Sequence, residues 1–485
     1  MKSKSFKAIL RYLGRMLMAE GALMLLCLVP AFYFGDGTVV PIAASGAFTL
    51  ALGAFVALTF KDFRTSDDRR MSYLLVTLIW ITLSLFGTLP LLATGATIRF
   101  TDAFFEAMSG LTSTGATIFS SVEVLPASIL MWRSMSQWFG GFGIILIVVA
   151  LSPSLGINKY SLYTAEASGA DNTGKMTTST STTVRRMLTI YVMLTFAFVI
   201  ALIVSGMQIW DAVNITFTNI SSGGFSIYDN SLAALTNPQQ YIVAVAMLLS
   251  GVNFSLLYFF FTFQWKRIGH KLDQFGFYIG ICIVAVLFVA SALHFKMGES
   301  PMDALRMAIV QSISVMTTTG SLVADTSAWW LPITYLFVML SFCGGMAGST
   351  SGGLKVMRVI ILMRNVGAVL RNRLHPNAVE PVRLNGKPVS PQIITNVMVV
   401  FFVFVFTIIM GVLAMMVCGI NATEAIGAAV GCITGYGPGL GLSGGFGSYA
   451  AFTVPAKWVC SFLMLLGRLE CLTVFVLFLR GFWRR

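Results

Sequence analysis

The sequence has few charged residues and few residues that commonly bind metals or carry out catalysis. Charged residues make up 11% of its 485 residues, and there are only three histidines, scattered along the chain at His270, His294 and His375. The seven cysteines contain no Cys-x-x-Cys pair, and no Walker A lysine motif is present. These absences argue against a disulfide framework, a His or Cys metal cluster and a phosphate-binding nucleotide loop. We predict that the chain is not an enzyme.

Hydrophobic residues dominate the composition, at 56% of the chain. Apolar stretches long enough to cross a bilayer recur from end to end, which is not the pattern of a soluble globular domain. We predict ten membrane spans, at 8–34, 39–60, 71–94, 131–152, 185–206, 239–263, 274–296, 330–350, 393–419 and 455–480. The expected fold class is therefore an all-α integral membrane protein in a lipid bilayer.

Four short stretches of the sequence resemble one another. Each begins with an acidic residue, runs through a semi-polar segment of helical length and ends in Ser/Thr-rich residues closed by glycine. The stretches lie at 102–117, 211–226, 303–322 and 423–439. The spacing from acid to glycine is thirteen residues in three copies. The third copy, Asp303 to Gly320, is longer by four residues, about one helical turn.

Each stretch is too short and too polar to span a membrane, and each falls between two predicted spans. The repeating unit is therefore span, re-entrant segment, span, four times around a pseudo-fourfold pore. The predicted organisation is a two-helix extension at 1–70, repeat 1 at 71–152, repeat 2 at 153–273, repeat 3 at 274–390 and repeat 4 at 391–485.

Positive charge is distributed unevenly along the chain. Most of the 32 Lys and Arg residues lie at 1–15, 61–70, 153–186, 264–273, 355–390 and 480–485, all on one side of the ten-span topology. The positive-inside rule then places both termini in the cytoplasm and makes the four stretches enter from outside. This topology explains the net charge of +13 without a nucleic acid partner. The basic run 355–390 could also dock a cytosolic protein.

The composition of the re-entrant stretches suits a monovalent cation. A short helix that enters from outside aims its carbonyl end, which carries partial negative charge, at the middle of the membrane. The acid at each start (Asp102, Asp211, Asp303, Glu424) suits a helix cap or the positive dipole end. We prefer that role to a ring of ion-binding carboxylates. Glycine then allows a sharp turn, and four carbonyl-lined segments can replace an ion's hydration shell.

With its four Ser/Thr-Gly stretches on span–re-entrant–span units, the sequence resembles the Trk/Ktr/HKT superfamily of potassium transporters. The leading helical pair resembles the bacterial Trk membrane subunit. The resemblance covers the whole chain. The sequence has Gly-Tyr-Gly at 435–437, the signature of potassium channel filters, and a single filter glycine in each of the other three copies.

This resemblance implies that K⁺ is the transported ion and that it binds backbone carbonyls just before each filter glycine. The implied carbonyl residues are Ser113, Thr114, Ser222, Gly223, Thr318, Thr319, Gly435 and Tyr436, and the implied filter glycines are Gly115, Gly224, Gly320 and Gly437. Two positions stay open from the sequence: Gly223 competes with Gly224 in the second copy, and Gly435 competes with Gly437 in the fourth.

The eighth span is interrupted by a run of small residues at 343–355. Its glycines include Gly345, Gly348, Gly352 and Gly353, and each glycine costs a helix up to about 1 kcal/mol relative to alanine. Close helix packing is one interpretation. We favour a flexible intramembrane loop that gates the ion path. The equivalent positions in repeats 1 and 2, at 140–143 and 251–253, are expected to be far less disrupted.

Arg468 lies in the middle of the last predicted span. A lone arginine there costs about 2.5–3.5 kcal/mol on insertion scales unless it finds water or a partner. Glu470 is two residues away and cannot share its helix face. Arg468 could form a buried pair with another acid, raise the barrier for a cation below the filter, or hold loop 343–355 through backbone carbonyls. The superfamily carries a basic residue at this place.

Two mechanisms remain open from the sequence. The first is potassium uptake across the bacterial inner membrane, channel-like and gated; the second is a symporter coupled to sodium or protons. Acids within spans are few, essentially Glu20 and Glu470, which favours the channel-like mechanism. The family implies a homodimer on a cytosolic ring of nucleotide-binding RCK-type subunits that bind NAD or ATP. The loops 153–183 and 355–390 are the expected docking sites.

Overall fold

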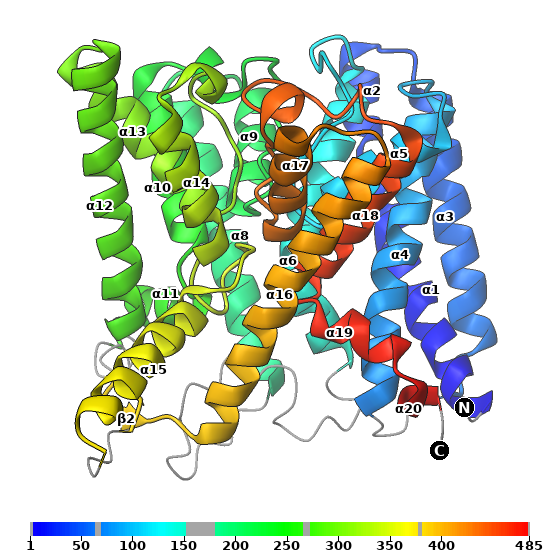
Figure 1. The fold of residues 1–485 in the computed structure, drawn as a ribbon. Coiled ribbons are helices and arrows are strands. Elements are labelled where there is room, and N and C mark those ends of the chain that lie inside the picture. The colour runs from blue at the N-terminus through cyan, green and yellow to red at the C-terminus, as the bar shows by residue number, and fades with distance from the viewer. Residues whose placement is uncertain (1–2, 64–68, 152–179, 265–271, 377–380, 484–485) are drawn as a thin grey trace.

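The computed structural model describes residues 3–63, 69–151, 180–264, 272–376 and 381–483, and nearly all of its regular elements are helices. The exception is a two-stranded antiparallel pair, β1 (Arg383–Leu384) and β2 (Lys387–Pro388). The first and last described helices begin and end at the lower edge of the molecule in Figure 1, while α5 (Phe100–Leu111), α9 (Ile209–Ile220), α13 (Pro301–Met316) and α17 (Ala422–Thr434) lie in its upper half. The all-α fold class is confirmed.

An N-terminal pair precedes the repeats. It comprises α1 (Ser3–Leu26), its short continuation α2 (Leu28–Phe34) and α3 (Val39–Thr59). The pair packs backbone to backbone through glycine. A Cβ atom built on Gly21 would lie 2.5 Å from the backbone nitrogen of Leu50 and 2.8 Å from the carbonyl oxygen of Gly46. Gly14 has the same relation to Gly53 and Ala57, so small residues set the helix separation.

Four units of the same design follow. Repeat 1 contains α4 (Arg69–Ala93), α5 (Phe100–Leu111) and α6 (Ala127–Leu151); repeat 2 contains α8 (Thr180–Val204), α9 (Ile209–Ile220), η1 (Ser231–Ala234), α10 (Asn237–Ser250) and α11 (Phe254–Phe261). Repeat 3 contains α12 (Leu272–Met297), α13 (Pro301–Met316), η4 (Thr326–Ala328), α14 (Leu331–Cys343) and α15 (Val356–Leu374). Repeat 4 contains α16 (Pro391–Val417), α17 (Ala422–Thr434), η5 (Gly441–Ser443), α18 (Val454–Arg468), α19 (Leu472–Phe475), η6 (Val476–Phe478) and α20 (Arg480–Trp483).

The second member of each unit, α5, α9, α13 or α17, is the predicted re-entrant helix. The third copy is longer, as its sequence spacing predicts: α13 has 16 residues, against 12 in α5 and α9. The acids lie at the third helical position in all four, so Arg99, Gln208, Ser300 and Asn421 are the N-caps instead. The predicted cap role is therefore wrong. The alternative, an acid in the positively polarised first turn, fits.

Membrane-spanning length is met by six continuous helical segments among the described residues, and two bent pairs would bring the number to eight. The bent pairs correct two predicted spans. Span 239–263 turns by 108° between α10 and α11, and span 455–480 turns by 105° after α18. Span 330–350 also ends early, because α14 stops at Cys343 after 13 residues.

The break at 251–253 is as sharp as the one in repeat 4, contrary to our expectation that it would be mild. Part of its cause is a helix cap: the Asn253 side chain accepts hydrogen bonds from the backbone N–H groups of Ser255 and Leu256 and starts a new helix. In repeat 4 the chain breaks where Glu470 and Cys471 adopt φ values of 57° and 53°. Helix direction therefore changes at the same level in repeats 2, 3 and 4.

The glycine contact between α1 and α3 leads to a stability prediction. Gly21→Leu places a side chain against the backbone of α3, and overpacking of this kind costs about 1–3 kcal/mol. We expect a lower unfolding temperature of the protein in detergent, measured by intrinsic fluorescence. Gly280→Leu on α12 is the matched control, because nothing lies within 4 Å of a Cβ built there. Equal effects of the two substitutions would contradict the proposed packing role.

Candidate ion-binding site

The chain makes the same turn after each of the four short helices. In repeat order, φ is 52° at Ser113, 55° at Ser222, 54° at Thr318 and 73° at Gly435. Two residues later it is positive again, at 84° for Gly115, 73° for Gly224, 79° for Gly320 and 88° for Gly437. These matched dihedrals align Gly224 and Gly437, rather than Gly223 and Gly435, with the glycines of the other repeats.

The four aligned glycines, here called the glycine ring (Gly115, Gly224, Gly320, Gly437), close on one another in chain order. A Cβ atom built on Gly115 would lie 2.1 Å from the carbonyl oxygen of Gly223. The corresponding distances are 1.8 Å from Gly224 to Thr319, 2.0 Å from Gly320 to Tyr436 and 2.4 Å from Gly437 to Thr114. Each glycine therefore abuts the carbonyl of the residue that precedes the next repeat's glycine. Any side chain here would displace backbone.

Backbone N–H groups before the glycine ring bond back to the short helices. Thr114 donates to the Ser109 carbonyl at 2.9 Å, and Thr319 donates to the Ser314 carbonyl at 2.8 Å. Gly223 and Tyr436 bond in the same way to Thr218 and Gly431. The carbonyls of seven of the eight predicted binding residues accept no hydrogen bond from the described part of the protein. The eighth, that of Gly223, accepts one from Gln137.

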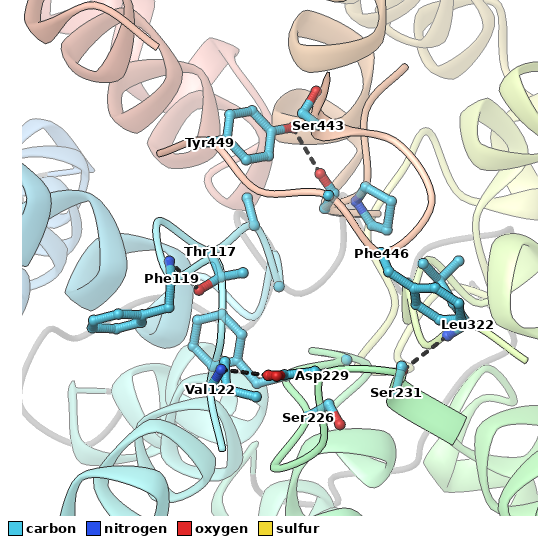
Figure 2. Close-up of a pocket in the computed structure, with 18 of the residues that line it drawn as sticks. Thr117, Phe119, Val122, Ser226, Asp229, Ser231, Leu322, Ser443, Phe446 and Tyr449 are labelled. Carbon is cyan, nitrogen blue, oxygen red and sulfur yellow. Dashed lines mark hydrogen bonds between the residues drawn. The ribbon is translucent and has the colours of Figure 1, made fainter. Parts of the chain in front are cut away.

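A pocket above the glycine ring receives residues from all four repeats (Figure 2). Asp229 projects toward it and accepts hydrogen bonds from Ser121 Oγ and the N–H groups of Val122 and Glu123. Partial burial opposes ionisation of Asp229, but these hydrogen bonds outweigh it and lower the pKa of the carboxyl below its ordinary value. The pocket therefore has an anionic group at neutral pH.

A buried ion pair supports one side of this pocket. Arg133 Nε donates to Glu106 Oε1 at 2.8 Å, and the side chains are 3% and 1% exposed. Glu106 also accepts from the Thr117 hydroxyl and the Ile118 N–H, and Arg133 donates to the Ser226 carbonyl at 3.0 Å. The pair therefore joins the outgoing segments of repeats 1 and 2.

The sequence predicts a gating loop at 343–355; in the structure Cys343 ends α14, and residues 344–355 lie directly against the inner ends of the short helices. The Thr350 hydroxyl lies 2.8 Å from that of Ser222, and the Gly352 N–H donates to Thr318 Oγ1 at 2.7 Å. The Gly353 N–H donates to the Thr434 carbonyl at 2.9 Å. One loop of repeat 3 thus contacts repeats 2, 3 and 4 at the level just inside the glycine ring.

Glycine is required in the loop because backbone approaches it closely. A Cβ built on Gly352 would lie 2.1 Å from the Thr434 carbonyl oxygen, and one on Gly345 would lie 2.8 Å from the Gly251 carbonyl oxygen. Gly348 and Gly353 both have positive φ, at 78° and 72°. The Gly348 carbonyl accepts the N–H of Phe254, so the break in repeat 2 receives the loop of repeat 3.

Arg468 is the last residue of α18 rather than a mid-helix residue. Its guanidinium donates to the Thr350 carbonyl at 3.1 Å and to the carbonyls of Gly140 and Gly141 at 2.7 and 3.0 Å. Of the predicted roles, the one supported by these contacts is that of holding the loop. Glu470 forms an ion pair with Arg358 of α15 at 2.5 Å, a partner that the sequence did not indicate.

Comparison with known proteins places this architecture. The family model "TrkH: Cation transport protein" matches residues 40–483. The chain belongs to the TrkH family. It is 33% identical to the Trk system potassium uptake protein TrkH of Escherichia coli K12, over 99% of both chains. It is also 33% identical to the Trk system potassium uptake protein TrkI of Halomonas elongata, over 85% of this chain and 84% of that one.

A solved structure agrees with the family assignment. The crystal structure of the potassium transporter TrkH from Vibrio parahaemolyticus matches with a TM-score of 0.88 and 32% identity, over all of both chains. The predicted membrane fold and the resemblance to the Trk superfamily are confirmed. The TrkH family is a transport family, which agrees with the prediction that the chain is not an enzyme.

The ion pair and Gln137 escaped the sequence analysis. Comparison of the four stretches could have pointed to Glu106, because Glu106 and Gln311 each lie nine residues before the ring glycine of their repeat. Gln311 Oε1 accepts the Val323 N–H just as Glu106 accepts that of Ile118. Repeats 2 and 4 carry Ile215 and Ala428 there. Nothing in the sequence pairs Gln137 with repeat 2.

Removal of Arg133 should destabilise the protein. Arg133→Met leaves the Glu106 carboxylate buried without its cation, and breaking a buried pair from one side costs about 3–5 kcal/mol. We expect a clear loss of thermal stability in detergent. The double substitution Arg133→Met with Glu106→Leu removes both charges and should recover part of it. A double variant as unstable as the single one would show that the uncompensated charge is not the cause.

Proposed function

We propose that this chain takes up K⁺ across the bacterial inner membrane through a channel-like path on the axis of the four repeats, with both termini cytoplasmic. The names of its relatives, which are potassium uptake proteins, support the substrate. The eight carbonyl residues predicted above form the selectivity filter. The observation that carries the proposal is the closed glycine ring, whose preceding carbonyls are almost free of protein donors.

The chemistry of the ring suits a weakly hydrated monovalent cation. Carbonyl oxygens can replace the water ligands of K⁺ without full charges that would trap the ion. The short helices direct their partially negative C-terminal ends to the same place. Asp229, ionised in the outer pocket, raises the local cation concentration at the entrance. Together these groups favour entry while keeping the binding weak enough for exit.

Loop 344–355 and Arg468 form the barrier below the filter. The loop bonds to the inner ends of three repeats, and Arg468 ties it to α6 through Thr350, Gly140 and Gly141. A positive charge held near the axis opposes a cation that leaves the filter. Opening then requires displacement of the loop, which breaks its bonds to Arg468 and to the inner ends of repeats 2, 3 and 4.

A symporter coupled to sodium or protons is the alternative mechanism. Proton coupling requires a group in the ion path that gains and loses a proton. Glu470 is paired with Arg358, and Glu20 is buried on α1 beside Gly87 of α4. Neither acid belongs to the glycine ring or to the outer pocket, and the pocket's own carboxylate, Asp229, is held ionised by its lowered pKa, which supports the channel-like mechanism.

Regulation would come from another polypeptide. We propose a homodimer on a cytosolic ring of RCK-type subunits that bind NAD or ATP. The candidate docking segment 355–390 forms α15 and the β1–β2 pair, and its last helical turn carries Arg371 and Arg373. The other candidate, 153–183, lies almost entirely outside the described residues.

The ring glycines should control selectivity. Replacing Gly115, Gly224, Gly320 or Gly437 with alanine combines an unfavourable φ with a clash against a carbonyl, so K⁺ preference over Na⁺ should fall. The reversal potential of proteoliposomes under opposed K⁺ and Na⁺ gradients measures this ratio, and an imposed pH gradient tests proton coupling. Gly298→Ala is the control, because its φ is 77° but nothing lies within 4 Å. Unchanged ratios in all four variants would remove the filter assignment.

Arg468 should restrict flux. Two unit charges about 4 Å apart at an effective dielectric near 20 interact by about 4 kcal/mol, so Arg468→Ala should raise K⁺ flux by about tenfold or more. Arg468→Lys keeps the charge but cannot reproduce the planar fork to three carbonyls. If holding the loop is the main role, lysine should behave like alanine; if charge is, lysine should stay close to wild type.

The control for Arg468 is Arg364→Ala, which removes a solvent-exposed arginine paired with Asp273. It should leave flux unchanged. Lower flux in folded Arg468→Ala protein would contradict both roles.

A further inference from the structure

The second quarter of the glycine ring differs from the other three. The residue before the ring glycine is Thr114 in repeat 1, Thr319 in repeat 3 and Tyr436 in repeat 4, but Gly223 in repeat 2. The other three side chains have partners: the Tyr436 hydroxyl accepts a hydrogen bond from Gln311 Nε2 of repeat 3 at 3.4 Å, and the two threonines make local contacts. Thr114 and Thr319 share hydrogen bonds of 2.8 Å with Thr112 and Thr317. Repeat 2 has no side chain at this position.

Gln137 of α6 occupies the vacant space. A Cβ atom built on Gly223 would lie 2.4 Å from Gln137 Cδ, 2.5 Å from Oε1 and 2.8 Å from Nε2. The amide therefore lies where a side chain of residue 223 would lie. Gln137 is fully buried and belongs to repeat 1, so one repeat supplies the group that its neighbour lacks.

The amide group forms hydrogen bonds to the backbone on both sides of Gly224. Nε2 donates to the Gly223 carbonyl at 2.8 Å, and Oε1 accepts the Phe225 N–H at 3.0 Å. A donor must face the carbonyl and an acceptor must face the N–H, so the two contacts determine the orientation of the amide. A carbonyl has two lone pairs, and the Gly223 oxygen can bond to Gln137 and still face an ion.

The Gly223 carbonyl keeps its place in the ring while it holds this bond. Its oxygen lies 2.1 Å from a Cβ atom built on Gly115. The corresponding distances at the other three ring glycines are 1.8–2.4 Å. Gln137 thus restrains one of four quasi-equivalent oxygens from outside the ring. An unrestrained oxygen could move inward around the smaller Na⁺ ion, and the ring would then discriminate less between the two ions.

We propose that Gln137 is a specificity-determining positioning residue: it stands in for the missing side chain of Gly223 and holds that carbonyl at the distance that K⁺ requires. This inference rests on the proposed function, because it needs the glycine ring to be the ion site.

The first test is Gln137→Met, which keeps the volume of the side chain and removes both hydrogen bonds. We expect the K⁺/Na⁺ permeability ratio of the full-length protein in proteoliposomes to fall about threefold to tenfold, the change that one net hydrogen bond corresponds to. The matched control is Gln240→Met. Gln240 is also buried and donates to two loop carbonyls, those of Leu232 and Leu235, away from the ring. It should lose stability but not selectivity.

A rescue experiment separates positioning from general stability. Gly223→Thr alone should be severely impaired, because its side chain collides with Gln137. Gln137→Ala alone should lose selectivity. Combined, the two substitutions place a threonine where repeats 1 and 3 already have one and free the space that it needs. The double variant should recover much of the permeability ratio, a non-additive result that a purely structural role would not produce.

The outcomes distinguish this inference from the function on which it rests. Wild-type ratios in Gln137→Met, together with a lost ratio in Gly224→Ala, would overturn the role of Gln137 and leave the filter assignment intact. Wild-type ratios in both would remove the filter itself. If Gln137→Met does not fold, the double variant decides: failure to regain selectivity in a folded double variant counts against the proposal.

Discussion

The structure depends on one constraint: backbone polar groups that end within a bilayer must find partners in the protein or face water or an ion. The four short helices stop at this depth, and their last carbonyls take back the N–H groups of the residues that follow. That solution leaves the carbonyls of the eight predicted binding residues without donors in the described part of the protein, apart from that of Gly223. It also forces two left-handed residues per repeat, and the second of each pair is a glycine. The closed ring follows from local hydrogen bonding repeated four times.

Below the ring, the same constraint explains the broken helices. In repeats 2, 3 and 4, the helix that follows the re-entrant segment is broken. Each break exposes carbonyl and N–H groups that would bond to each other in a straight helix. Loop 344–355 uses those of Gly251 and Phe254, while Arg468, at the break in repeat 4, donates to Thr350 of the loop and to the Gly140 and Gly141 carbonyls of the continuous helix α6. The backbone groups exposed at the helix breaks therefore form hydrogen bonds with the loop. In the proposed gate, movement of the loop would exchange these bonds for bonds to water.

Local features were predictable from the sequence, and long-range ones were not. The four units, the longer α13 and the ring glycines follow from spacing, because helix length and glycine turns are encoded within each stretch. Spacing alone could not decide whether Gly223 or Gly224 is the ring glycine of repeat 2. The backbone dihedrals identify Gly224. The sharp bend at 251–253 was missed because a short Gly-Val-Asn run looks mild. Its cause is an asparagine cap together with a loop from another repeat.

Fusion of the four units into one chain explains the remaining differences. In an assembly of identical subunits, every quarter of the ring must be supported in the same way. Here repeat 1 uses Glu106 with Arg133, repeat 3 uses Gln311, and repeat 2 carries Ile215 and takes its support from α6 of its neighbour. Because each quarter can be supported separately, one oxygen of the ring can be restrained without changing the others. In the proposed filter, this separate support would let the ion preference be adjusted one carbonyl at a time, through residues such as Gln137 that lie outside the ring.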